Sequence, residues 1–108
     1  MMTSTTNEIF GHRVVRHIGV VRGITVRSRN ALSDAIGGVQ SMLGGRVGAY
    51  VKLAEVGRQE AFEHLVEHAK AAGANAILAM RYDATEIMPG VTEVLAYGTA
   101  VVVEEVRA

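Results

Sequence analysis

Two histidines, His64 and His68, stand four residues apart in the second half of the chain. On a helix this spacing brings both imidazole rings to one side, as in two-histidine metal sites. The glutamate that serves as general base in HExxH metalloproteases is missing, because Leu65 follows His64. Two interpretations remain open: a pair of histidines at the rim of a packed face, or half of a divalent-metal site that another segment or subunit completes.

A second set of residues has the chemistry to hold an anion. On a helical wheel Arg58 falls inside an apolar arc, where a guanidinium must be paired or must reach solvent along its stem. One interpretation is a structural ion pair with Asp83 or Glu86. The other is anion binding, in which Arg46 and Tyr50 are further candidates.

The sequence offers little that is typical of a catalytic site. No serine has a GxSxG context, and the glycine-rich stretch 37–48 lacks the GxxxxGK[ST] pattern of a nucleotide loop. Glu60, Glu63 and Glu67 are typical of a solvated helix face rather than of an acid/base pair. Nothing in the sequence supports an enzyme. An enzyme acting on an anionic substrate held by Arg46 and Arg58 is kept as an alternative.

Composition and charge exclude several classes of protein. The 108 residues have no net charge and no cysteine, which excludes disulfide scaffolds and thiolate metal sites. Residues 9–53 carry seven basic side chains and one acidic one, whereas residues 54–108 carry four basic and nine acidic. This segregation favours contacts between the two halves, within or between subunits, over nucleic-acid binding. No membrane or targeting segment is found, so we expect a soluble cytoplasmic protein.

The order of predicted elements indicates one domain over 9–108, preceded by a flexible or edge-paired lead-in over 1–8. We expect a strand over 13–26, a short helix beginning near Ala31, a tight glycine-rich connection, and a long helix over 49–72 that Gly73 ends. Two strands follow, over 76–82 and 92–106, with a turn at Met88-Pro89-Gly90.

The apolar faces of these elements predict how they pack. On the first strand the even positions form an apolar face, and Gly19 and Gly23 on the other face suggest a bulge or close packing by a neighbour. The final strand is apolar on both faces, which one helix cannot cover, so a second copy is the simplest source of cover. The expected core arc of the long helix is Tyr50, Ala54, Ala61, Leu65, Ala69 and Ala72, and Ala76, Leu78, Met80 and Tyr82 are expected on one face of their strand.

Several short motifs occur in an order that resembles a known family of small bacterial proteins. They are Gly19-Val20-Val21-Arg22-Gly23, Gly44-Gly45-Arg46 with Tyr50, Arg58 with Ala61, Ala72-Gly73-Ala74-Asn75-Ala76, and Tyr97-Gly98-Thr99-Ala100-Val101. Together they resemble the YbjQ-like family, also called UPF0145 or DUF74, over residues 5–104. The chain departs from the family pattern at Val47, where a polar residue is frequent, and at Gly57, where alanine is usual.

The resemblance implies an α+β subunit similar to the dodecin group, in which an antiparallel sheet wraps on one long helix. It also implies a homopentameric ring, with the chain's own copies as partners; from the residues themselves we expect neither a nucleic-acid nor a membrane partner. Family members are often labelled heavy-metal-binding, but without cysteine no soft-ligand site can be transferred. We therefore expect a non-catalytic ring-forming homo-oligomer with a metal- or small-ligand-binding role; the cofactor is unknown, with a divalent metal ion as the candidate.

Overall fold

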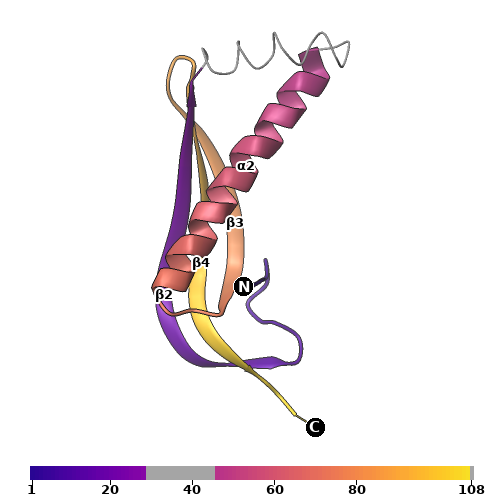
Figure 1. Cartoon of the computed structure of the whole chain (residues 1–108), viewed down its shortest axis with the longest axis vertical. Helices are drawn as coiled ribbons and strands as arrows, with labels where there is room; N and C mark the ends of the chain where they lie inside the picture. Colours follow the sequence, from indigo (N-terminus) through magenta and orange to yellow (C-terminus); the bar gives the residue numbers. More distant parts are fainter. Residues whose placement is uncertain (29–45, 108) are drawn as a thin grey trace.

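Four strands and one long helix make up the computed structural model, which describes residues 1–28 and 46–107 (Figure 1). The sheet order is β1-β3-β4-β2; β1 runs parallel to β3, and the other neighbours are antiparallel. The α+β prediction is confirmed, although β1 makes the sheet mixed. The short helix expected near Ala31 and most of the glycine-rich connection lie outside the described residues. The elements are β1 (Met2–Thr3), β2 (His12–Ser28), α2 (Arg46–Ala71), β3 (Ala76–Met88) and β4 (Val91–Glu105).

Helix α2 begins three residues earlier than predicted and ends one residue earlier, before the predicted stop at Gly73. Gly73 has a φ of 91°, which costs glycine little. The Gly73 amide donates to the carbonyl of Lys70, and the Ala74 amide donates to that of Ala69, both at 3.0 Å. This pair of bonds is the Schellman arrangement, which satisfies carbonyls that the helix end leaves open.

The main core lies between α2 and one face of the sheet. Ala61, Leu65 and Ala69 are fully buried against β2, β3 and β4. Tyr50, Ala54 and Ala72 of the predicted arc are exposed instead. Tyr50 and Ala54 are exposed because the helix crosses the sheet obliquely and its first turns lead away from the strands (Figure 1), whereas Ala72 lies beyond the last residue of the helix. As predicted, β4 meets this core with small residues: Val94, Ala96, Gly98 and Ala100 are buried.

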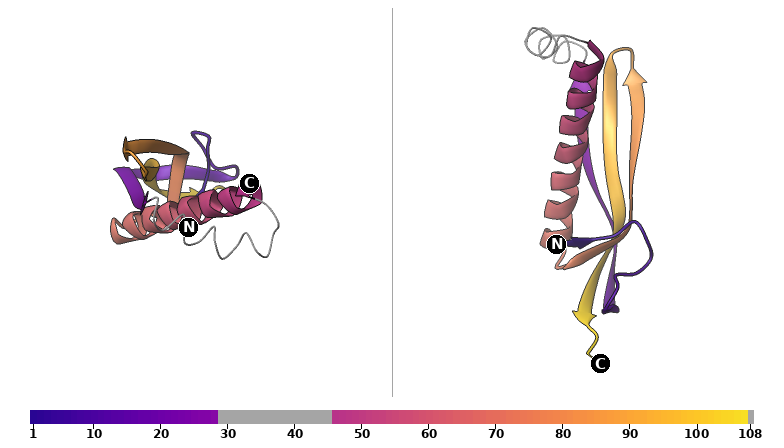
Figure 2. Two further views of the ribbon diagram at one scale, coloured as in Figure 1. Left: turned by 90° about the horizontal axis from the view of Figure 1, so that it is seen from above. Right: turned by 90° about the vertical axis from the view of Figure 1, so that its right-hand side faces the viewer.

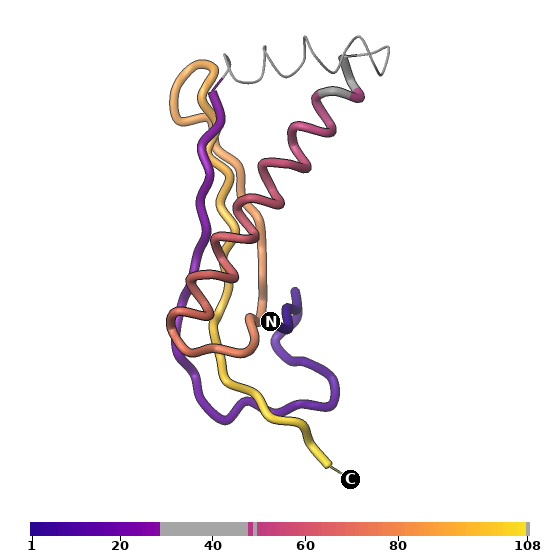
Figure 3. Tube along the Cα trace, in the orientation of Figure 1, coloured from indigo at the N-terminus to yellow at the C-terminus, as the bar shows by residue number. Residues whose placement is uncertain are grey.

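A second, smaller core lies on the opposite face of the sheet, at one end. Ala76, Leu78, Val101 and Val103 are buried there, and Met2 and Ile9 of the first residues pack against them. The Met2 amide donates to Asn75 O and the Ser4 amide to Ile77 O, so the chain start runs beside the beginning of β3 (Figure 3). The first nine residues therefore cover part of the face that α2 leaves open.

A bulge in β3 overturns one predicted face. Ala79 has a φ of 53°, and the pairing with β4 shifts between Leu78 and Arg81. The amides of Ala79 and Met80 donate to Thr6 O and Ser4 O of the chain start. The prediction that Leu78 and Met80 share a face is wrong, because the extra residue sends Leu78 into the second core and Met80 into the main core.

On β2 the residues that face α2 are the odd ones, Val21, Gly23 and Thr25. A Cβ at Gly23 would lie 2.1 Å from Ala61 O and 2.3 Å from Leu65 N, both backbone atoms of α2. Of the two explanations predicted for these glycines, close packing by a neighbour applies to Gly23. A bulge applies to Gly19, which lies at a register shift of β2. The helix lies directly on the strand because this position has no side chain.

We expect Gly23→Ala to lower the free energy of unfolding by about 3 kcal/mol, the upper end of typical overpacking costs, because the clash is with backbone rather than with a movable side chain. Chemical denaturation followed by circular dichroism at one fixed protein concentration measures the change. Gly48→Ala on α2 is the matched control. Nothing lies within 4 Å of its Cβ position, so its stability should be unchanged or raised by up to about 1 kcal/mol. Equal effects of the two variants would contradict close packing at Gly23.

Candidate functional site

His64 and His68 lie one turn apart on the side of α2 that faces the free edge of β2. His64 Nδ1 is 2.9 Å from Ile24 O. His68 Nδ1 is 3.2 Å from both the amide nitrogen and the carbonyl oxygen of Arg22. Because β2 is an outer strand of the described sheet, these backbone groups have no neighbouring strand within the described residues to pair with. The two imidazoles therefore cap the open edge of the sheet.

This capping determines which ring nitrogen of His64 is available for other partners. A carbonyl oxygen only accepts, so His64 Nδ1 must donate to Ile24 O and Nε2 then carries a free lone pair. Metal-binding histidines are commonly oriented in this way, with the second nitrogen held by a backbone carbonyl. His68 Nδ1 either accepts from the Arg22 amide or donates to the Arg22 carbonyl, and only the second choice leaves its Nε2 free.

The described residues of one copy do not form a complete metal site. Within residues 1–28 and 46–107, no group of three or more His, Cys, Asp or Glu side chains is placed to hold an ion. Soft metals prefer thiolates, and the sequence has no cysteine. The imidazole pair suits a borderline ion such as Zn²⁺, Ni²⁺ or Cu²⁺, whose remaining ligands must come from outside this part of one copy.

Arg58 does not pair with either predicted acid. Its guanidinium carbon lies 5.8 Å from the centroid of the Tyr82 ring, a cation–π distance. Asp83 accepts from the Ala84 amide, and Glu86 accepts from the Gly90 amide in the hairpin turn. In the described residues the ion pairs that form between the two halves of the chain are Arg13–Glu104 and Arg27–Glu60.

The three candidate anion-binding residues all lie on α2, but the two arginines are far apart along it. Arg46 is the first residue of α2, twelve positions before Arg58, a separation of about 18 Å along the axis. Tyr50 is half exposed on the turns that lead away from the sheet. The side chain of Arg46 lies outside the described part of the structure. A single small anion bridging Arg46 and Arg58 within one copy is therefore not supported.

Sequence reasoning predicted that one helix would leave a face of the sheet uncovered, but it did not place that surface across β2, β3 and β4. On the side away from α2, pairing across the strands aligns Arg22 with Tyr97 and Arg81, and Ile24 with Leu95. Figure 2 shows the helix along one face and no described element over the far part of the other. We call this surface the bare face, and its alternation of apolar and charged residues was the available signal. It comprises Val20, Arg22, Ile24, Val26, Arg81, Asp83, Glu93, Leu95 and Tyr97.

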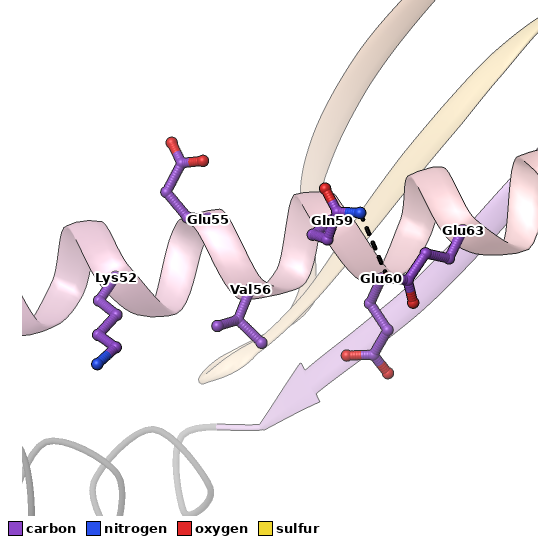
Figure 4. Close-up of a pocket in the computed structure, with 6 residues that line it drawn as sticks. All are labelled: Lys52, Glu55, Val56, Gln59, Glu60 and Glu63. Atoms are coloured by element: carbon purple, nitrogen blue, oxygen red, sulfur yellow. Dashed lines mark hydrogen bonds between the residues drawn. The ribbon is translucent and has the colours of Figure 1, made fainter.

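The outward side of α2 carries shallow depressions. Among the described residues, one of about 420 Å³ is bordered by side chains of α2, of which Lys52, Val56 and Glu60 point to one side (Figure 4). A second, of about 310 Å³, continues towards the helix end. Gln59 Nε2 donates to Glu63 Oε1 between them. We call this surface the helix groove, and its members are Lys52, Glu55, Val56, Gln59, Glu60, Phe62, Glu63, Val66 and Glu67.

Comparison with known proteins identifies similar chains. A family model described as "Putative heavy-metal-binding" matches residues 1–104. A UPF0145 protein of Chromobacterium violaceum is 52% identical over 103 residues, which are 95% of this chain and 88% of that protein. The UPF0145 protein lpg0197 of Legionella pneumophila is 48% identical over 103 residues, 95% and 98% of the two chains.

One solved structure shares the fold. A DUF74-family protein of unknown function from Pediococcus pentosaceus superposes with a TM-score of 0.58 over 96% of this chain and 98% of that chain, at 15% sequence identity. That likeness supports the α+β arrangement of strands and helix. No helix within the described residues has both the length and the apolar character needed to cross a bilayer.

The two roles open to His68 Nδ1 are distinguished by hydrogen exchange. If it accepts from the Arg22 amide, His68→Ala should speed exchange of that amide by roughly twofold to tenfold, the range that one hydrogen bond supplies. NMR-detected exchange at Arg22 measures this. His64→Ala is the control, because it removes a donor to Ile24 O and should leave the Arg22 amide unchanged. An unchanged rate in His68→Ala would assign the donor role to Nδ1.

Proposed function

Because the chain belongs to the YbjQ-like family of UPF0145 proteins, we propose that it acts as a self-assembling cytoplasmic protein rather than as a catalyst. The observation that carries the proposal is the bare face. Val20 is 76% exposed, Val26 52% and Ile24 41%, all on one face of β2. Exposed apolar side chains that gather on one face mark an interaction site in a protein that must stay in solution.

The shape of the chain supports the same proposal. Its Cα radius of gyration is 17.1 Å and its extents are 55 × 28 × 19 Å. A compact domain of this length has a radius of gyration of about 13 Å. A small elongated subunit buries less of its surface alone than a compact one does, so it has more to gain by packing against copies of itself.

We propose a closed ring of five copies as the form of the assembly, in line with what the family resemblance implies. Its support is that the two uncovered surfaces differ in kind: one is a sheet face, and the other is a helix face. When a surface meets a different surface of the next copy, the contact repeats in one direction and closes into a ring if the rotation permits.

Light scattering after gel filtration tests the assembly directly. We expect a mass of about five times the 11.5 kDa of one chain at micromolar concentration. A monomer under these conditions would refute self-assembly. A stable oligomer of another size would refute the ring of five while leaving self-assembly in place.

A second candidate function is favoured by the anchored ring of His64. We propose that His64 Nε2, together with His68, contributes to a divalent-metal site that a neighbouring copy completes. Support comes from the bond between His64 Nδ1 and Ile24 O, which holds the ring in place and leaves Nε2 as an acceptor. When bound, the ion would tie adjacent subunits together.

Titration calorimetry with Zn²⁺, Ni²⁺ and Cu²⁺ tests this site on the wild type and on the double variant His64→Ala/His68→Ala. We expect the double variant to bind at least about a hundredfold more weakly, because two of the ligands are removed. His17→Ala is the matched control, since His17 is an exposed histidine on β2, and its affinity should equal that of the wild type. Equal affinities in all three proteins would remove the claim.

A further inference from the structure

We infer that the bare face of one copy packs against the helix groove of the next copy, with Arg22 and Arg81 opposite Glu63 and Glu67. This inference rests on the proposed self-assembly and names the surfaces that mediate it. The partner is a second copy of the chain, met head to tail. Four considerations support that choice. They are the charges of the two surfaces, the positions of those charges along the strand direction, the apolar residues of the two surfaces, and the poorer fit of two bare faces packed against each other.

One row of the bare face is complementary in charge to the helix groove, and the acidic residues of that face, Asp83 and Glu93, lie in the rows that follow, beside Leu95 and Val26. On the bare face, Arg22 and Arg81 flank Tyr97 in one row across three strands. The Arg81 guanidinium is held by Thr5 O and Met80 O, which fixes it while leaving donors free. The helix groove presents Glu63 and Glu67 from the half of α2 that lies on the sheet. No ion pair within the described residues involves Arg22, Arg81, Glu63 or Glu67.

The positions of these charged residues along the strand direction also match. The contact of His68 with Arg22 places that turn of α2 level with Arg22 along the strands. Glu67 precedes His68, so its backbone lies within about 1.5 Å of the same height. Copies in a closed ring are related by rotation without translation. With the ring axis along the strands, Glu67 of one copy therefore comes level with Arg22 of the next.

The apolar parts of the two surfaces correspond as well. Around the arginine row the bare face offers Ile24, Leu95 and Tyr97. The helix groove offers Phe62 and Val66 beside Glu63 and Glu67, and these two side chains are only partly covered by the subunit's own core. Packing these surfaces together buries an apolar centre within a charged rim, the usual composition of a specific interface.

The alternative of two bare faces packed against each other fits less well. A twofold axis through the arginine row brings the rows of two copies together, and like charges across an interface cost several kcal/mol. It also leaves the helix groove of both copies uncovered. The head-to-tail contact covers both surfaces of every copy in the ring.

Charge reversal tests the pairing, with mass photometry over a dilution series as the measurement. We expect Arg22→Glu to raise the protein concentration at half-assembly at least about tenfold, because it places a carboxylate opposite Glu63 and Glu67. Glu67→Arg should do the same from the other side. Arg107→Glu is the control, since Arg107 is exposed and lies beyond the last strand, and it should assemble like the wild type.

The double variant Arg22→Glu/Glu67→Arg tests whether these two side chains meet across the interface. In a head-to-tail contact the two reversals face each other at every junction, so assembly should return to within about threefold of the wild type. Circular dichroism of each variant verifies folding. Single variants that assemble like the wild type, or a double variant no better than Arg22→Glu, would overturn the inference while the wild-type oligomer still supports self-assembly. A monomeric wild type would instead refute the proposed function itself.

Discussion

The closeness of α2 to β2 at Gly23 is the constraint on which the rest of the structure depends. The backbone of Ala61 and Leu65 occupies the space that a side chain at this position would need. Because the helix lies so near to an outer strand, its histidines reach the strand's unpaired backbone groups, and Glu60 reaches Arg27. The same contact sets the heights at which Glu63 and Glu67 stand beside the sheet. A wider spacing would lose all of these contacts together.

Features that depend on local chemistry could be predicted from the sequence. The end of α2 at Gly73 and the small-residue face of β4 are both confirmed, because capping and alternation are properties of a few adjacent residues. The bulge at Ala79 could not be predicted, since it forms where two carbonyls of the chain start accept hydrogen bonds from β3. Likewise, the exposure of Tyr50 depends on the angle at which α2 leaves the sheet, and no local pattern encodes that angle.

The candidate site likewise has some features that could be predicted from the sequence and others that could not. The spacing of His64 and His68 predicted two rings on one side of a helix, and the structure places both on the side of β2. Their attachment to the strand edge could not be foreseen, because it depends on which strand lies outermost. For Arg58 the predicted acids proved to be engaged by nearby amides, and an aromatic ring took their place. Distant pairings of this kind follow from the assembled fold.

The histidine-capped edge of β2 also bears on how copies of this chain can join. An outer strand with free amides and carbonyls invites another strand to extend the sheet, and such growth has no natural end. At Arg22 and Ile24 those backbone groups are already engaged by imidazoles, so an incoming strand would have to displace two rings held on a rigid helix. At this point edge-to-edge polymerisation is disfavoured. Association through the faces of the subunit, which can close on itself, is left as the open route.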